Sequence, residues 1–156
     1  MEIKNVGVIG CWQMGGGIVQ TAAQAGFDVK VSEVNESFLS KGLNTIKSNL
    51  SRNVEKGRMT KEEMDAVLGR IHGTTNIADF SDRDLVVEAV IENMEMKKKL
   101  FAELDKICPP AAILATNTSC LSIIDMAMTT KRADKVLGIH FFNPVPVIEY
   151  PRSGSS

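Results

Sequence analysis

The segment from Val6 to Gly17, VGVIGCWQMGGG, restricts the fold of this chain more than any other part of the sequence. A short β-branched run leads into a glycine-rich turn, and a helical pattern follows. In a G-x-G-x-x-G turn the first glycine makes the bend, the second lets the backbone approach a diphosphate, and the third lets the helix pack on the strand. Gly10 and Gly15 hold the first and third positions, but Trp12 holds the second. The segment therefore predicts a dinucleotide-binding turn with one position changed.

Short apolar runs alternate with helical periods along the rest of the chain. The predicted strands cover residues 6–9, 28–32, 73–76, 85–90, 112–116 and 136–142. The predicted helices cover residues 15–25, 39–54, 60–71, 96–107 and 122–128. Strands that are apolar on both faces and alternate with helices form a parallel sheet covered on both sides. We predict one α/β domain over residues 1–150, a Rossmann-type doubly wound, mainly parallel sheet with a helical pair inserted after the second strand.

Local signals support the predicted helix ends. Gly26 and Gly57 follow the first two helices, where glycine commonly ends a helix. Thr60 and Glu63 have the spacing of a capping box that starts the third helix. Residues 151–156 show no periodicity and resemble a linker or a cloning remnant, so we leave them out of the predicted fold.

Composition excludes several classes of protein. The chain has 156 residues, 24% charged residues and a net charge of −1, which gives no reason to expect nucleic acid or a membrane surface as a partner. The 3 cysteines lack a paired spacing and favour reduced thiols. We see no long apolar run, no room for a signal peptide before the first strand and no metal-ligand cluster. These features lead us to expect a cytoplasmic protein without a metal.

Glu33 adds a second feature to the nucleotide site, because it ends the second predicted strand. A carboxylate at this place accepts hydrogen bonds from adenosine ribose hydroxyls and repels a 2′-phosphate, so NAD is favoured over NADP. The alternative is that Gly10 and Gly15 serve only the turn and its packing, and that Glu33 is a solvated strand end.

Trp12 allows two geometries. Its indole either fills the groove that the diphosphate would use, which would severely weaken NAD binding, or points to solvent and leaves binding weaker but present. The role of the second glycine favours the first geometry.

Four further segments carry a family resemblance: GCWQMGGGI at 10–18, LVVEAVIENMEMKKKLFAELD at 85–105, ILATNTSCLSI at 113–123 and GIHFFNPVPVIE at 138–149. With them the chain, from about residue 3 to residue 149, resembles the N-terminal NAD-binding domain of 3-hydroxyacyl-CoA dehydrogenases, including the 3-hydroxybutyryl-CoA dehydrogenases. The resemblance implies hydride transfer between NAD and the 3-hydroxyacyl-CoA/3-ketoacyl-CoA pair in fatty acid metabolism.

The resemblance also implies roles for individual residues. His140 matches the family's general base, and Ser119 matches a serine that holds the substrate oxygen. The implied cofactor contacts are Gly10, Trp12, Gln13, Met14, Gly15, Glu33, Ala89, Glu92, Lys97, Asn117 and Asn143. From the residues alone, His140 is more simply a structural histidine, Ser119 a helix cap, and both asparagines turn formers. Glu92 and Lys97 would then be solvated charges at a helix start. The helical pair between residues 36 and 70 resembles the segment that contacts the CoA nucleotide, although its charges are nearly balanced.

Three departures from the family pattern bear on activity. Trp12 is the first. The second is Arg152, which stands where the family has the carboxylate that orients the catalytic histidine, next to Tyr150–Pro151 in place of an apolar strand. Glu149 is a poor substitute, since an odd offset along a strand points it to the other face. The third is the family's helical C-terminal domain, which this sequence does not include.

We therefore expect an NAD-dependent dehydrogenase domain that has little or no turnover as this isolated chain. A non-catalytic Rossmann module with a structural or assembly role is the main alternative. A related short-hydroxyacid dehydrogenase is a third. Apolar surface left uncovered without the second domain makes a homo-oligomer plausible.

Overall fold

A computed structural model describes residues 2–90, 93–117 and 123–139 of the chain. These residues form a six-stranded sheet in the order β3-β2-β1-β4-β5-β6, and every neighbouring pair is parallel. The strands are β1 (Asn5–Ile9), β2 (Asp28–Ser32), β3 (Ile71–Thr74), β4 (Leu85–Glu88), β5 (Ile113–Thr116) and β6 (Val136–Gly138). The order reverses between β1 and β4, which confirms the predicted Rossmann-type doubly wound sheet.

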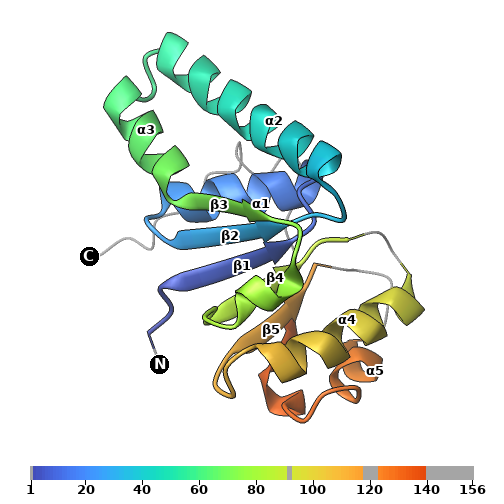
Figure 1. Ribbon diagram of the computed structural model, residues 1–156. Helices are drawn as coiled ribbons and strands as arrows, with labels where there is room; N and C mark the ends of the chain where they lie inside the picture. The colour runs from blue at the N-terminus through green and yellow to red at the C-terminus, as the bar shows by residue number, and fades with distance from the viewer. Residues whose placement is uncertain (1, 91–92, 118–122, 140–156) are drawn as a thin grey trace.

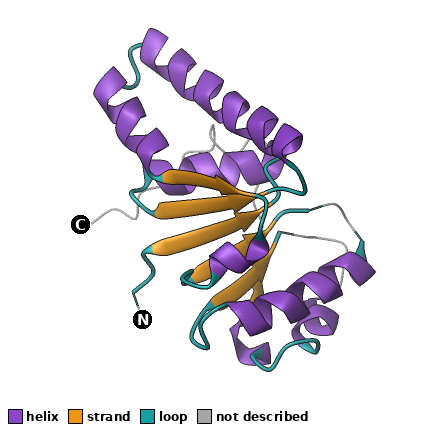
Figure 2. Ribbon diagram, in the orientation of Figure 1, coloured by secondary structure: helices purple, strands orange, loops and turns teal. Residues whose placement is uncertain are grey.

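Helices cover both faces of this sheet (Figure 1). They are α1 (Gln13–Gln24), α2 (Glu36–Glu55), α3 (Lys61–Gly69), α4 (Met94–Ile107) and α5 (Ile123–Ala127). The predicted pair inserted after the second strand is α2 and α3, which project together beyond the sheet in Figure 2. Within the described residues, no helix combines the length and apolar character needed to cross a membrane.

The core has two halves because successive strand residues point to opposite faces. Val8 joins the half under α1 and α2, and its neighbour Ile9 joins the half under α4. Val87 and Val86 divide in the same way in β4. Burial on both faces explains why the strands read as continuous apolar runs rather than as alternating patterns.

The helix ends follow the local signals. Thr60 accepts a hydrogen bond from the Glu63 backbone N–H at 3.1 Å, as the capping-box spacing predicts for its side chain. Asn35 and Asn93 cap α2 and α4 in the same way. Gly26 and Gly57 adopt φ values of 99° and 71°, a region that glycine enters without strain.

Several boundaries differ from the predicted ones. Ile71, expected on the third helix, instead begins β3 because it pairs with Val29 of β2. β3 therefore covers residues 71–74 rather than 73–76. β1 and α1 both begin earlier than predicted. β4 ends at Glu88, and the Val90 N–H beyond it donates to the Glu88 carboxylate instead of to a neighbouring strand. The described part of the sixth strand ends at Gly138, and residues 140–142 of the prediction lie outside the described residues. Two short 3-10 helices, Ile77–Phe80 and Ala133–Lys135, were not predicted.

Arg83 ties the amino ends of the central strands together. Its buried guanidinium donates to Asp28 Oδ1 at 2.7 Å and to Asp82 Oδ1 at 2.8 Å, and it also reaches the Val6 carbonyl at 3.3 Å. The hydrogen bond from Arg83 lowers the pKa of Asp82 to about 2. Burial alone would raise the pKa of Asp28, but Arg83 and His72 together lower it below its usual range.

This arrangement predicts acid sensitivity. A carboxylate with a lowered folded-state pKa contributes stability above its unfolded-state pKa, and the contribution disappears as the pH falls through the folded-state value. We expect the free energy of unfolding to fall between about pH 4 and about pH 2. In an Arg83→Met variant it should be smaller at pH 7 and fall less steeply over that window. Urea unfolding across the pH series measures both slopes, and equal slopes would contradict the assignment.

Candidate cofactor-binding site

The predicted site residues that the structure describes lie at the carboxyl edge of the sheet, toward which the arrowheads of β1, β2 and β4 point (Figure 2). The glycine-rich turn follows β1, and Glu33 follows β2. Ala89 follows β4, and Asn117 follows β5, where its backbone N–H donates to the Glu88 carbonyl at 2.9 Å. The edge lies where the strand order reverses, which is the place where open α/β sheets bind ligands.

Gly10 and Gly15 are required by close contacts within this edge. Gly10 has φ +97°, and a Cβ there would lie 2.7 Å from the Ala89 carbonyl oxygen. A Cβ on Gly15 would lie 1.7 Å from the Gly10 carbonyl oxygen. The Ala89 N–H donates to the Ile9 carbonyl at 2.9 Å, so the end of β4 is fixed against the turn. The two glycines thus have the turn and packing roles that the sequence predicts.

The N-terminus of α1 differs from those of α2 and α4. Trp12 occupies its N-cap position without a side-chain cap, and the first turn has no acidic residue. By contrast, α2 and α4 each have an asparagine cap and a glutamate in the first turn. The first N–H groups of a helix have no partner within it, and the helix dipole favours an anion there. This end of α1 is therefore suited to a diphosphate.

The Trp12 side chain points to solvent, with 74% of the residue exposed. Its backbone φ of −81° and ψ of −160° are ordinary extended values, so the turn forms without strain. The geometry with the indole buried in the groove is therefore wrong for this structure. The next two predicted contacts begin α1, with Gln13 exposed and Met14 half-buried. How much Trp12 weakens NAD binding stays a prediction.

Glu33 lies against the same turn. Its Oε1 accepts the Cys11 backbone N–H at 2.9 Å. Glu33 Oε2 has no hydrogen-bond partner among the residues that the structure describes. Glu33 is half-buried, and this second oxygen can accept a further hydrogen bond. Burial, together with the Glu33 charge, raises the pKa of the adjacent Cys11 to about 12, which keeps that thiol protonated and unreactive.

Lys97 is not the solvated charge that its sequence position suggests. Its side chain is fully buried, and Nζ donates to both carboxylate oxygens of Glu88 at 2.8 and 2.9 Å. Thr116 donates to Glu88 Oε1 at 2.6 Å. Sequence reasoning missed Glu88 and Thr116 as members of this edge. The sequence feature that could have identified them is the carboxylate of Glu88 inside the apolar run LVVEAV. A carboxylate that is buried requires a partner.

Four predicted site residues lie outside the described residues: His140, Ser119, Glu92 and Asn143. The same holds for Arg152, and for Cys120. Their roles stay predictions. Where the chain is described, no three His, Cys, Asp or Glu side chains gather as a metal site would require.

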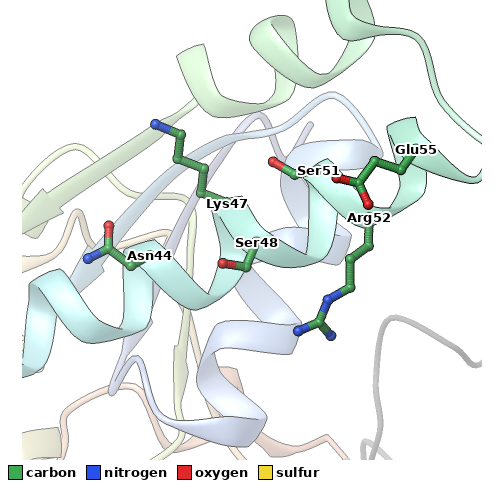
Figure 3. A pocket seen from close by; sticks show the side chains of 6 residues that line it. All are labelled: Asn44, Lys47, Ser48, Ser51, Arg52 and Glu55. Carbon is green, nitrogen blue, oxygen red and sulfur yellow. The ribbon is translucent and has the colours of Figure 1, made fainter.

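A shallow hollow runs along the outer face of α2. Its lining residues all come from that helix: Asn44, Lys47, Ser48, Ser51, Arg52 and Glu55 (Figure 3). In this view Lys47 and Arg52 extend away from each other, so their charges do not converge on one point. The hollow offers hydroxyls and two cations, but its geometry does not by itself select a ligand.

The glycine contacts predict opposite effects for two neighbouring substitutions. Gly15→Ala should lower the free energy of unfolding by about 3 kcal/mol, because the new Cβ collides with the Gly10 carbonyl. Gly16→Ala is the matched control, since its Cβ would meet Cys11 O only at 3.7 Å. It should raise stability by about 0.5–1 kcal/mol through helix propensity. Urea unfolding of both variants tests the pair, and a similar loss in each would contradict the packing described.

Comparison with known proteins agrees with this geometry. Residues 5–150 match the family described as 3-hydroxyacyl-CoA dehydrogenase, NAD binding domain. A probable 3-hydroxybutyryl-CoA dehydrogenase of Bacillus subtilis is 46% identical over 96% of this chain and 52% of its own length. A 3-hydroxybutyryl-CoA dehydrogenase of Mycobacterium tuberculosis is 47% identical over 94% of this chain and 51% of its own length.

Solved structures show the same fold. FadB2 of M. tuberculosis superposes with a TM-score of 0.92 at 46% identity, covering 95% of this chain and 52% of that one. The 3-hydroxybutyryl-CoA dehydrogenase of Escherichia coli K12 also gives 0.92, at 39% identity, covering 94% of this chain and 31% of that one. The chain spans about half the length of the curated relatives it matches. It belongs to the 3-hydroxyacyl-CoA dehydrogenase family and corresponds to that family's NAD-binding domain.

Proposed function

We propose that this chain binds NAD along the carboxyl edge of β1, β2 and β4, as the cofactor domain of an L-3-hydroxyacyl-CoA dehydrogenase. The observation that carries the proposal is the turn from Gly10 to Gly15. A Cβ on Gly10 would collide with the Ala89 carbonyl, and one on Gly15 would collide with the Gly10 carbonyl. The turn leads into a helix whose N-terminus has no side-chain cap.

The described residues fit the cofactor at both ends of this turn. The first N–H groups of α1 supply donors for the diphosphate. Glu33, held beside the turn by Cys11, supplies an acceptor for the adenosine ribose hydroxyls. The negative charge of Glu33 opposes a 2′-phosphate, which favours NAD over NADP.

The reaction that we assign is hydride transfer between NAD and the 3-hydroxyacyl-CoA/3-ketoacyl-CoA pair. When bound, NAD supplies the hydride acceptor for the carbon that carries the hydroxyl. His140 takes the hydroxyl proton in the oxidation direction and returns it in the reduction, since an imidazole exchanges protons near neutral pH. Ser119 holds the substrate oxygen. Both roles rest on the family resemblance, and so does placing the CoA nucleotide along α2 and α3.

Turnover by this chain alone should be very low. Arg152 stands where the family pattern has the carboxylate that orients the catalytic histidine, and loss of such a partner reduces rates by orders of magnitude. This chain also spans only about half the length of the curated relatives that it matches.

A turnover assay tests this part of the proposal. With acetoacetyl-CoA and NADH we expect a rate below about 0.01 s⁻¹, against the roughly 10 s⁻¹ that is typical of enzymes. The loss of NADH absorbance measures the rate, with a reaction lacking acetoacetyl-CoA as the blank. A rate near the typical value would show that the chain is catalytically complete.

A titration tests cofactor binding and the effect of Trp12 together. We expect Trp12→Gly to lower the NADH Kd at least about tenfold, or about 1.4 kcal/mol, by letting the diphosphate approach the backbone. Trp12→Ala removes the indole and keeps the Cβ, so it separates the effect of the indole on the NADH Kd from the effect of the Cβ. Calorimetry measures all three proteins on one scale.

Equal affinity of the wild-type chain and Trp12→Gly would show that the exposed indole does not hinder NAD. Absence of binding by all three folded proteins would favour the alternative, a non-catalytic Rossmann module with a structural or assembly role. Measurable NADH binding with a preference for another short hydroxyacid would instead place the chain with a related dehydrogenase.

A further inference from the structure

A buried ion pair lies at the carboxyl end of β4, directly behind the proposed cofactor site. The side chains of Glu88 and Lys97 are both 0% exposed. Besides the two bonds from Lys97, the Glu88 carboxylate accepts the Thr116 hydroxyl at 2.6 Å and the Val90 N–H at 2.7 Å. One carboxylate thus joins α4, β5 and the chain just after β4.

The sheet register places this carboxylate at the centre of the edge. Glu88 is paired with Ile9, the last residue of β1, and with Thr116, the last residue of β5. Its side chain points to the face that α4 covers, where Lys97, Phe101 and Leu104 form the buried stripe of that helix. The ion pair therefore occupies the layer just beneath the ends of three neighbouring strands.

The bond from Val90 connects this layer to the glycine-rich turn. It ties Val90 to the Glu88 carboxylate directly after β4, beside the two residues that face Gly10 and Gly15. A Cβ added to Gly10 would lie 2.7 Å from the Ala89 carbonyl oxygen and 3.5 Å from Val90 Cγ1. A Cβ added to Gly15 would lie 3.6 Å from Ala89 Cβ. The glycine-rich turn thus packs against Ala89 and Val90.

A buried ion pair is a weak source of net stability, because the desolvation of both charges offsets much of their attraction. What a carboxylate with four hydrogen bonds supplies is a fixed geometry. We propose that Glu88 is a positioning residue for cofactor binding. Its carboxylate, paired with Lys97, holds Ala89 and Val90 in place and thereby sets the shape of the turn that receives the NAD diphosphate. This inference rests on the proposed NAD binding.

A second, largely buried ion pair at the opposite end of α4 provides a matched control. Arg132 Nε donates to Asp105 Oδ1 at 2.7 Å, and the guanidinium also binds the carbonyls of Asp105, Cys108 and Ala112 at 2.9, 3.2 and 3.1 Å. This pair fixes the turn from α4 into β5, away from the carboxyl edge. Replacing its carboxylate by an amide perturbs an ion pair on the same helix without touching the proposed site.

The experiment compares Glu88→Gln with Asp105→Asn in the full chain. Urea unfolding gives the stability of each variant, and calorimetry gives the NADH Kd. We expect Glu88→Gln to raise the Kd at least about tenfold. Asp105→Asn should lose stability while its Kd stays within about twofold of the wild-type value. Amide hydrogen exchange at Val90, measured without ligand, should accelerate only in Glu88→Gln.

The double variant Glu88→Gln/Lys97→Met covers the case in which a buried Lys97 charge without the Glu88 carboxylate beside it prevents folding. It removes the buried charge, so it should recover stability relative to Glu88→Gln and keep the raised Kd. A folded Glu88→Gln or double variant with a Kd within about twofold of wild type would overturn the inference, and so would an equal rise in Asp105→Asn. Those results leave NAD binding by the wild-type chain intact. Failure of the folded wild-type chain to bind NADH would overturn the proposed function and the inference together.

Discussion

The contact between the β1–α1 turn and the end of β4 is the constraint on which the rest of this structure depends. Gly10 and Gly15 let the helix start within van der Waals distance of two backbone segments, and the geometry leaves no room for larger residues. This contact places α1 on the sheet and directs its N-terminus to the point where the strand order reverses. The position of the candidate site is therefore a consequence of backbone packing rather than of any one polar side chain.

The two edges of the sheet are built differently. At the amino edge, Arg83 crosses the starts of β1 and β2, and Arg132 ties the turn from α4 to the start of β5. Both guanidiniums donate hydrogen bonds to backbone carbonyls and to nearby carboxylates, and these bonds join neighbouring segments rigidly. At the carboxyl edge, within the described residues, the N-terminus of α1 has no side-chain cap and Glu33 Oε2 accepts no hydrogen bond. The buried ion pair of Glu88 and Lys97 lies just beneath this edge.

Features encoded by local sequence were predicted well. The turn after β1, the cap of α3, and the glycines that end helices depend on a few adjacent residues, and the alternation of elements determined the sheet type. Features that depend on distant pairing were not. Ile71 continues a helical period, yet it forms a strand because Val29 lies beside it. Lys97 looks like a surface charge until α4 packs on β4 and brings it to Glu88.

The direction of the Trp12 indole is likewise set by the folded turn, since the sequence was compatible with both geometries. His140, Ser119, Glu92 and Asn143 rest on family resemblance, and their roles stay predictions.

The central claim is that NAD lies across the carboxyl ends of β1, β2 and β4, and amide NMR during an NADH titration tests it most directly. NAD at this edge should give saturable shifts at Gly10, Gln13, Gly15, Glu33 and Ala89, with little change along the outer face of α2 from Asn44 to Glu55. Shifts confined to that face of α2, or no saturable shift at the turn, would contradict it.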